Sequence, residues 1–117
     1  MEVVYEDNHL IVVNKAAGEI VQGDKTGDKP LSEMVKDYLR EKYNKPGNVF
    51  CGVIHRLDRP VSGLVVFAKT SKALARMNEI FQNRKVKKTY WAISRNLPPR
   101  AEDTLVDYLT PRERNNK

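Results

Sequence analysis

The chain has 117 residues, of which 21 are Lys or Arg and 15 are Asp or Glu, so its formal charge at pH 7 is +6. This length allows one domain with a modest core. The longest apolar runs, 10–13 and 64–68, are too short to cross a bilayer, so no membrane partner is expected. The basic excess suits a polyanion such as RNA, although a basic soluble protein without such a partner fits the charge equally well.

The first third of the chain predicts a hairpin, a loop and a helix. Two short strands, 3–5 and 9–14, flank turn residues 6–8, and so close a connection makes the pair antiparallel. Lys15, just after the second strand, is expected to be a solvated surface side chain. Residues 21–29 are polar and predict a loop that has room to flex over a substrate. Asp28 is the expected helix N-cap. The apolar face of the helix comprises Leu31, Met34, Val35, Tyr38 and Leu39.

Residues 50–54 and 64–68 are predicted strands on either side of a polar loop. The second run lacks alternation, which predicts that it is covered on both faces. Thr70 or Ser71 is expected to cap a second helix. Its apolar stripe comprises Ala73, Leu74, Met77, Ile80 and Phe81.

The last quarter of the chain begins with a β-favouring run at 89–93. Residues 104–109 form a short strand or a single helical turn, and 111–117 a polar tail. The predicted fold class is therefore α/β of the α+β type, with a mixed, mostly antiparallel sheet and two flanking helices.

The polar loop carries one carboxylate, Asp58, between two guanidinium groups, Arg56 and Arg59. Positive neighbours favour the ionised form of an acid. Pro60 and Gly63 set the backbone of a tight turn, because proline fixes φ and glycine tolerates unusual φ. Taken alone, these residues describe a surface ion pair in a turn at least as well as a reactive carboxylate.

The loop and the strand after it contain a long motif, without gaps, in which the combination of residue types is uncommon. Its residues are His55, Arg56, Leu57, Asp58, Ser62, Gly63 and Leu64, followed by Phe67, Ala68, Lys69 and Thr70. This run resembles the signature of the RluA family of pseudouridine synthases, which isomerise uridine to pseudouridine in ribosomal or transfer RNA. Val61 departs from the family, where many members have Thr. Ala16 also departs, because the family has Pro in a Lys-Pro-x-Gly turn there.

The resemblance implies that Asp58 is the catalytic carboxylate, acting either as nucleophile or as the base that promotes a glycal intermediate. Arg56 would hold the RNA and take the place of the extruded base. Residues 88–90 are similar to the family's second motif, in which Tyr90 would pack on the flipped uracil and move a proton. Structural residues at the site would be His55, Leu57, Ser62 and Gly63. The reaction needs no metal and no cofactor.

Basic residues on and after the loop are predicted to bind RNA: Arg56, Arg59, Lys69, Arg84, Lys85, Lys87 and Lys88. The last four precede Tyr90 and Trp91, and bases next to aromatic residues suit single-stranded RNA. Without the resemblance, a charged loop ahead of a core strand explains the same residues. Ribosomal RNA is the expected substrate, ahead of transfer RNA.

The resemblance makes residues 1–117 the first half of a pseudouridine synthase catalytic domain, with the second half absent and no separate RNA-binding domain. Half a domain leaves strand edges and apolar faces without cover, so self-association through the incomplete sheet is expected. Two alternatives to an active enzyme stay open: a non-catalytic RNA-binding module and an inert piece of such an enzyme. A single cysteine, Cys51, excludes an intrachain disulfide and fits a reducing cytoplasm. Glu2, Glu6 and Asp7 are acidic where a signal peptide would be basic, so no signal peptide is expected.

Overall fold

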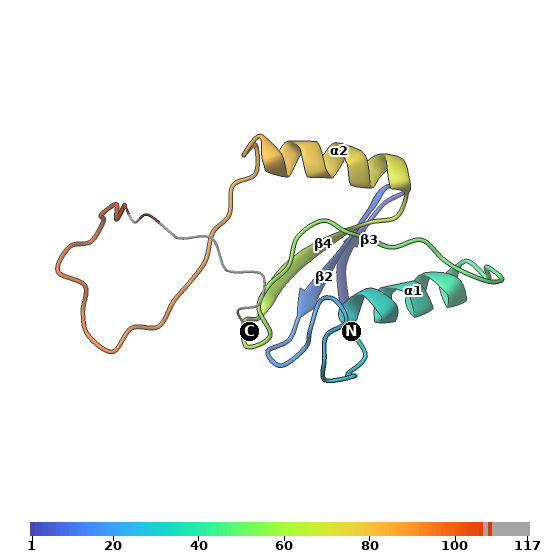
Figure 1. Ribbon diagram of the computed structural model, residues 1–117, viewed down its shortest axis with the longest axis horizontal. Helices are drawn as coiled ribbons and strands as arrows, with labels where there is room; N and C mark the ends of the chain where they lie inside the picture. The colour runs from blue at the N-terminus through green and yellow to red at the C-terminus, as the bar shows by residue number, and fades with distance from the viewer. Residues whose placement is uncertain (107, 109–117) are drawn as a thin grey trace. The chain divides into compact units, whose positions relative to one another are not determined.

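The computed structural model describes residues 1–106 and 108. Its elements are β1 (Glu2–Glu6), β2 (Leu10–Lys15), α1 (Leu31–Lys42), β3 (Gly52–Val53), β4 (Gly63–Ala68) and α2 (Ser71–Gln82). These six elements lie within residues 1–87, which form one compact unit, and residues 88 onward form a second unit. The strands make one sheet in the order β1-β2-β4-β3, in which every neighbouring pair is antiparallel. Figure 1 shows α1 and α2 on opposite sides of this sheet. The predicted α+β fold is confirmed.

The β1–β2 hairpin turns where the sequence predicts, because Asp7 organises the connection. Its carboxylate accepts the main-chain N–H groups of His9 and Leu10, each at 2.7 Å, and the hydroxyl of Tyr5 at 2.7 Å. A short polar side chain that bonds the backbone just ahead of it stabilises a tight turn. These bonds, led by that of Tyr5, lower the pKa of Asp7 to about 2.

The core lies between α1 and one face of the sheet. Ile11 and Val13 of β2 lie opposite Phe67 and Val65 of β4, and these four side chains are fully buried. They pack against the buried residues of α1, which are Leu31, Val35 and Leu39. The expected apolar face of α1 is thereby confirmed.

Strand β4 is covered unevenly, contrary to the prediction that both of its faces are buried. Val65 and Phe67 are buried, but Leu64 is 57% exposed and Val66 only half-buried. The reason is that α2 reaches β3 and one end of β4, where Leu74 lies against Gly52. The apolar run therefore behaves as an alternating strand, with its second face only partly covered.

The predicted caps of the two helices have different outcomes. Thr70 caps α2, because its hydroxyl accepts the Ala73 N–H at 3.1 Å. Asp28 does not cap α1; the N-cap is Pro30, which makes no side-chain bond. Instead, the carbonyls of Ile20 and Val21 accept the first helical N–H groups, at 2.7 and 3.1 Å. Tertiary contacts thus satisfy donors that a capping side chain would otherwise satisfy.

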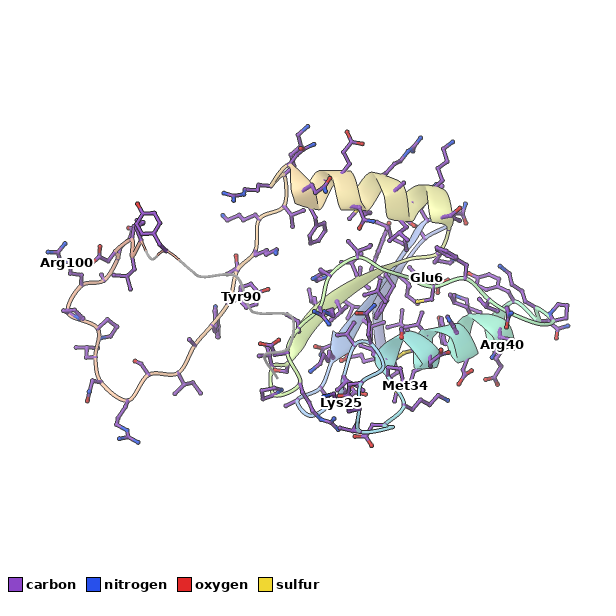
Figure 2. The ribbon with its side chains drawn as sticks, viewed as in Figure 1. Glu6, Lys25, Met34, Arg40, Tyr90 and Arg100 are labelled. Atoms are coloured by element: carbon purple, nitrogen blue, oxygen red, sulfur yellow. The ribbon has the colours of Figure 1, made fainter. Side chains whose placement is uncertain are left out.

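Residues 88–106 contain no helix or strand, so the strand predicted at 89–93 is not present. Trp91 and Ile93 are fully exposed, and Tyr90 lies on this irregular segment (Figure 2). β-Favouring residues form a strand only where another strand supplies hydrogen bonds. Residues 104–106 are also irregular, while residue 107 and residues 109–117, which include the end of the segment predicted at 104–109 and the polar tail, lie outside the described residues. Within the described part of the chain, neither helix could cross a membrane.

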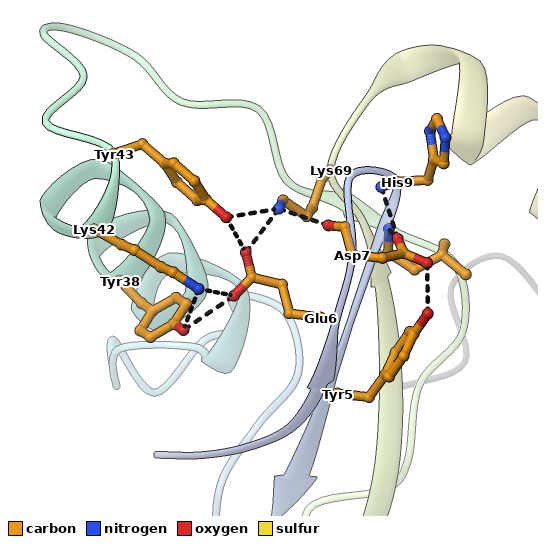
Figure 3. Close-up of polar contacts among 9 residues, drawn as sticks. Tyr5, Glu6, Asp7, His9, Tyr38, Lys42, Tyr43 and Lys69 are labelled. Atoms are coloured by element: carbon orange, nitrogen blue, oxygen red, sulfur yellow. Dashed lines mark hydrogen bonds and ion pairs between the residues drawn. The ribbon is translucent and has the colours of Figure 1, made fainter.

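Glu6 joins the hairpin to α1 and to the end of β4 (Figure 3). Its side chain is 8% exposed, and its carboxylate accepts four side-chain hydrogen bonds. The donors are Tyr43 at 2.6 Å, Lys69 at 2.7 Å, Lys42 at 2.8 Å and Tyr38 at 3.0 Å. Burial by itself would raise the pKa of Glu6, but these bonds outweigh it and lower the pKa to about 2.

This cluster predicts an acid-sensitive contribution to folding. Because the folded pKa of Glu6 lies below its ordinary value of 4.5, its contribution is complete above pH 4.5 and is lost as the pH falls through about 2. This lowering of the Glu6 pKa corresponds to about 3 kcal/mol of the free energy of unfolding at neutral pH. Glu6→Gln should therefore lower the free energy of unfolding by about that amount at pH 7. The difference from the unmodified protein should shrink toward zero near pH 2.

Urea unfolding at a series of pH values measures this difference. Glu2→Gln is the matched control, because Glu2 lies on the same strand but is exposed, and its carboxylate accepts a single hydrogen bond from the described side chains, that of Asn14 at 2.8 Å. It should have a small effect at every pH. A pH-independent difference for Glu6→Gln would show that the charge on Glu6 is not what stabilises the cluster.

Candidate active site

The loop between β3 and β4 carries Asp58 on a tight turn. The Val61 N–H donates to the Asp58 carbonyl at 2.9 Å, which closes the turn over Arg59 and Pro60. The side chains of Arg56, Asp58 and Arg59 are exposed. Among the described residues, Asp58 and Arg56 form no ion pair within 4.0 Å. Asp58 is therefore not the acid of a local Arg–Asp pair, which was the plainer interpretation of the sequence.

The main chain of this turn is held by a buried lysine. Lys15 is 1% exposed, and its ammonium donates to the carbonyls of Val61 at 2.5 Å, Arg59 at 2.9 Å and Asp58 at 3.3 Å. A fourth carbonyl, that of Ala16, lies at 3.2 Å. Burial lowers the pKa of Lys15, and the nearby charge of Arg59 acts in the same direction. The ammonium thus fixes the turn that presents Asp58.

The expectation that Lys15 is a solvated surface residue is wrong. A signal for its burial was present in the strand pattern, because Ile11, Val13 and Lys15 alternate and so point to one face. That face is the core face, as the burial of Ile11 and Val13 shows. A backbone hydrogen bond also holds this turn: the Gly18 N–H donates to the Arg59 carbonyl at 2.8 Å.

The four predicted structural residues lie around the turn. The Val66 N–H of β4 donates to His55 Nε2 at 3.0 Å, and the His55 ring lies 5.0 Å from that of Phe81. Gly63 has φ +144°, which favours glycine, and a β-carbon there would lie 3.4 Å from Leu57. Ser62 is exposed. Strand β3 bonds β4 only at Gly52 and Val53. Beyond it, the side chain of His55 accepts a main-chain bond from β4 and so connects the loop that leads to Asp58 to the sheet.

Asp58 lines a cleft of about 220 Å³. One wall is residues 20–24 and the other is residues 56–59. The cleft is smaller than the ~300–1,000 Å³ typical of pockets for drug-sized ligands. Its volume is therefore below that of a site for a drug-sized molecule.

Arg59 joins the two walls of the cleft. Its guanidinium donates to the carboxylate of Asp28 and lies 3.7 Å from that of Asp24. The hydrogen bond from Arg59 is also the main cause of the lowered pKa of Asp28. These groups are exposed, and exposed ion pairs are worth only ~0–1 kcal/mol. Arg59 can therefore exchange them for phosphate at little cost, and its contact with RNA stays a prediction.

The other predicted RNA-binding residues are not among those that line this cleft. The side chain of Lys69 is 12% exposed, and its ammonium donates to Glu6, to the Asp7 carbonyl at 2.7 Å and to the Tyr43 hydroxyl at 3.3 Å. These partners favour a structural role for Lys69 over phosphate contact. Arg84, Lys85 and Lys87 are exposed after α2. Lys88 and Tyr90 belong to the second unit, and the contact of Tyr90 with uracil stays a prediction.

Comparison with known proteins identifies the family. The family model described as RNA pseudouridylate synthase matches residues 9–117. This chain belongs to the RNA pseudouridylate synthase family. The matched range includes the Lys15 strand, both walls of the cleft and the Asp58 turn, so the structural features above lie within the family's domain.

Relatives act on two classes of RNA by name. The tRNA pseudouridine synthase C of Vibrio cholerae is 41% identical over 108 residues, which is 92% of this chain and 41% of that protein. The ribosomal large subunit pseudouridine synthase D of Yersinia pestis is 35% identical over 95 residues, 80% of this chain and 28% of that protein. The chain thus spans less than half the length of these relatives.

A solved structure supports the fold. The human RNA pseudouridylate synthase domain containing 4 matches with a TM-score of 0.61 at 21% identity, over 72% of this chain and 30% of that one. The arrangement of the sheet and helices is therefore the one found in a pseudouridylate synthase domain.

Proposed function

We propose that the intact protein isomerises uridine to pseudouridine in RNA, with Asp58 as the catalytic carboxylate. The observation that carries the proposal is the setting of Asp58. Its side chain is exposed and lines a cleft, while the backbone of its turn is fixed by the buried ammonium of Lys15. Family membership supplies the reaction class. A catalytic acid must be accessible to its substrate and must be carried by a rigid backbone that holds it in the reactive position.

The reaction breaks the glycosidic bond to N1 of uracil and forms a new bond from the sugar to C5. The C5 proton leaves to solvent, and N1 gains a proton, so no redox partner is needed. An ionised Asp58 serves this chemistry either as a nucleophile toward the sugar or as the base that yields a glycal. In this proposal Arg56 occupies the space of the flipped uridine, and Tyr90 packs on its base.

Tritium release gives a direct test of the activity. RNA labelled with tritium at C5 of uridine loses the label when C5 takes the glycosidic bond. Incubation of the intact protein with labelled ribosomal RNA should release tritium, while an RNA labelled at C5 of cytidine should not. Binding of both RNAs without any release would favour the alternative, a non-catalytic RNA-binding module or an inert piece of a synthase.

The RNA class is a finer part of the proposal. We propose ribosomal RNA, which relatives named for the large ribosomal subunit support. Transfer RNA is the alternative that relatives named for tRNA support. Labelled transcripts of both classes, tested side by side at equal concentration, decide between them by their rates of tritium release.

Two further proposals concern the state of the chain. The exposed apolar residues Val4, Tyr5 and Leu64 support self-association through the partly covered sheet. Sedimentation of a compact monomer at micromolar concentration would contradict self-association.

A cytoplasmic location is proposed from the single cysteine. Burial raises the pKa of Cys51 to about 12, so this thiol is unreactive at neutral pH.

A further inference from the structure

The two helices of residues 1–87 end in the same backbone motif. After α2, the Arg84 N–H donates to the Phe81 carbonyl at 3.1 Å and the Lys85 N–H to the Ile80 carbonyl at 3.0 Å. This pair of bonds defines a Schellman motif, whose central residue adopts the left-handed conformation. Arg84 is that residue, with φ +55°.

The end of α1 provides an internal comparison. The Asn44 N–H donates to the Glu41 carbonyl at 3.4 Å and the Lys45 N–H to the Arg40 carbonyl at 3.0 Å. Asn44 is the left-handed residue there, with φ +50°. Glycine and asparagine are the usual occupants of this position, because a larger L side chain is strained in it. Among the described residues other than glycine, only Asn44 and Arg84 have positive φ. An arginine at the end of α2 is therefore the unexpected choice.

Charge pairing also differs between the two helix ends. At the end of α1, Arg40 pairs with Asp37 at 2.8 Å and Lys42 with Glu6 at 2.8 Å. After α2, the exposed Arg84, Lys85 and Lys87 form no ion pair with any residue that the structure describes. A cation near a helix C-terminus interacts favourably with the helix dipole. Lys85 already supplies such a cation without a strained backbone, so the dipole does not explain Arg84.

We propose that residues 84–87, the basic turn, form a phosphate-binding corner for RNA that is distinct from the Asp58 cleft. The Schellman bonds order its backbone, and Arg84 occupies the strained position because its guanidinium contacts a phosphate in a bidentate manner. Backbone strain is commonly retained where a side chain has a binding role. The inference rests on the proposed function, because RNA is the polyanion that the proposed reaction brings to this surface.

Glycine substitutions at the two helix ends test the proposal in the intact protein. Arg84→Gly and Asn44→Gly both place glycine at the left-handed position of the same motif. Arg84→Gly removes the strain and should unfold at a higher temperature than the unmodified protein, while Asn44→Gly should change that temperature little. Only Arg84→Gly should bind fluorescein-labelled oligouridylate more weakly, by roughly fivefold in fluorescence anisotropy. Its log–log dependence of affinity on salt should be shallower by about 0.7, the contribution of one phosphate contact on a single strand.

Arg84→Asn is a second variant that tolerates the left-handed conformation, and it should show the same loss of affinity. Unchanged affinity in both Arg84 variants, while the unmodified protein binds, would overturn this inference alone. A lower unfolding temperature for Arg84→Gly would also overturn it, because Arg84 would then be a structural residue. Absence of binding by the unmodified protein would overturn the proposed RNA function together with the inference.

Discussion

Replacement of Asp58 by Asn is expected to abolish pseudouridine formation by the intact protein, by roughly 10³-fold or more. The amide has nearly the same shape as the carboxylate but cannot act as a nucleophile or as a base. Asp58 is exposed and, within the described residues, takes no part in an ion pair, so its replacement should leave stability nearly unchanged. RNA affinity should change by less than about twofold, because phosphate contacts supply most of it.

Tritium release measures the loss of activity, and fluorescence anisotropy measures RNA affinity in the same samples. Asp37→Asn is a suitable control, since Asp37 is an exposed acid of α1 that pairs with Lys29 and Arg40. That control should keep normal activity. Turnover by Asp58→Asn within tenfold of the unmodified protein would remove Asp58 from its proposed role.

Replacement of Lys15 by Met should impair the reaction without removing any group that touches RNA. Methionine fills similar space but supplies no donors, so the carbonyls of Asp58, Arg59 and Val61 lose the ammonium. Two of these carbonyls keep one backbone bond each, from Val61 and from Gly18. We therefore expect the free energy of unfolding to fall by about 1–3 kcal/mol. A displacement of the turn by ~1 Å would reduce kcat about 100-fold with little change in RNA affinity.

Two further variants separate the structural effect from a loss of charge. Lys15→Arg keeps the charge but brings a planar fork of donors to a site shaped around a compact ammonium, so it should not restore activity. Lys36→Met removes a lysine from the surface of α1, where it pairs with Glu33 at 3.6 Å, and should be nearly silent. Amide hydrogen exchange should report faster exchange of the Val61 N–H in Lys15→Met. Normal kcat in that variant would contradict the positioning role.

The hairpin, both helices and the strand that follows Asp58 were predictable from local patterns. Turn residues around Asp7, apolar spacing along α1 and the cap at Thr70 each act over a few neighbouring residues, so sequence order alone contains the information. The family could also be predicted, because its signature is a contiguous run. The roles of Asp58 and Tyr90 were inferred from that resemblance and stay predictions.

The features that local patterns missed depend on residues far apart in the chain. Asp28 was the expected helix cap, yet the carbonyls of Ile20 and Val21 bond the start of α1, and Asp28 pairs with Arg59 instead. The run 89–93 has strand-forming residues but no strand partner among the described residues. Arg84 is a different case, because its left-handed backbone is local to the end of α2, yet no residue type in the sequence marks that position as glycine would.

The sequence by itself determined the family and the order of the elements up to residue 87, and it singled out Asp58 as the proposed catalytic acid, because each of these is recorded in neighbouring residues. Only the tertiary structure decided what holds that acid in place. The strand that contains Lys15 and the turn that contains Asp58 are separated by more than forty positions. They meet because β2 pairs with β4, which sets Lys15 opposite Gly63 and its ammonium among the carbonyls of the turn.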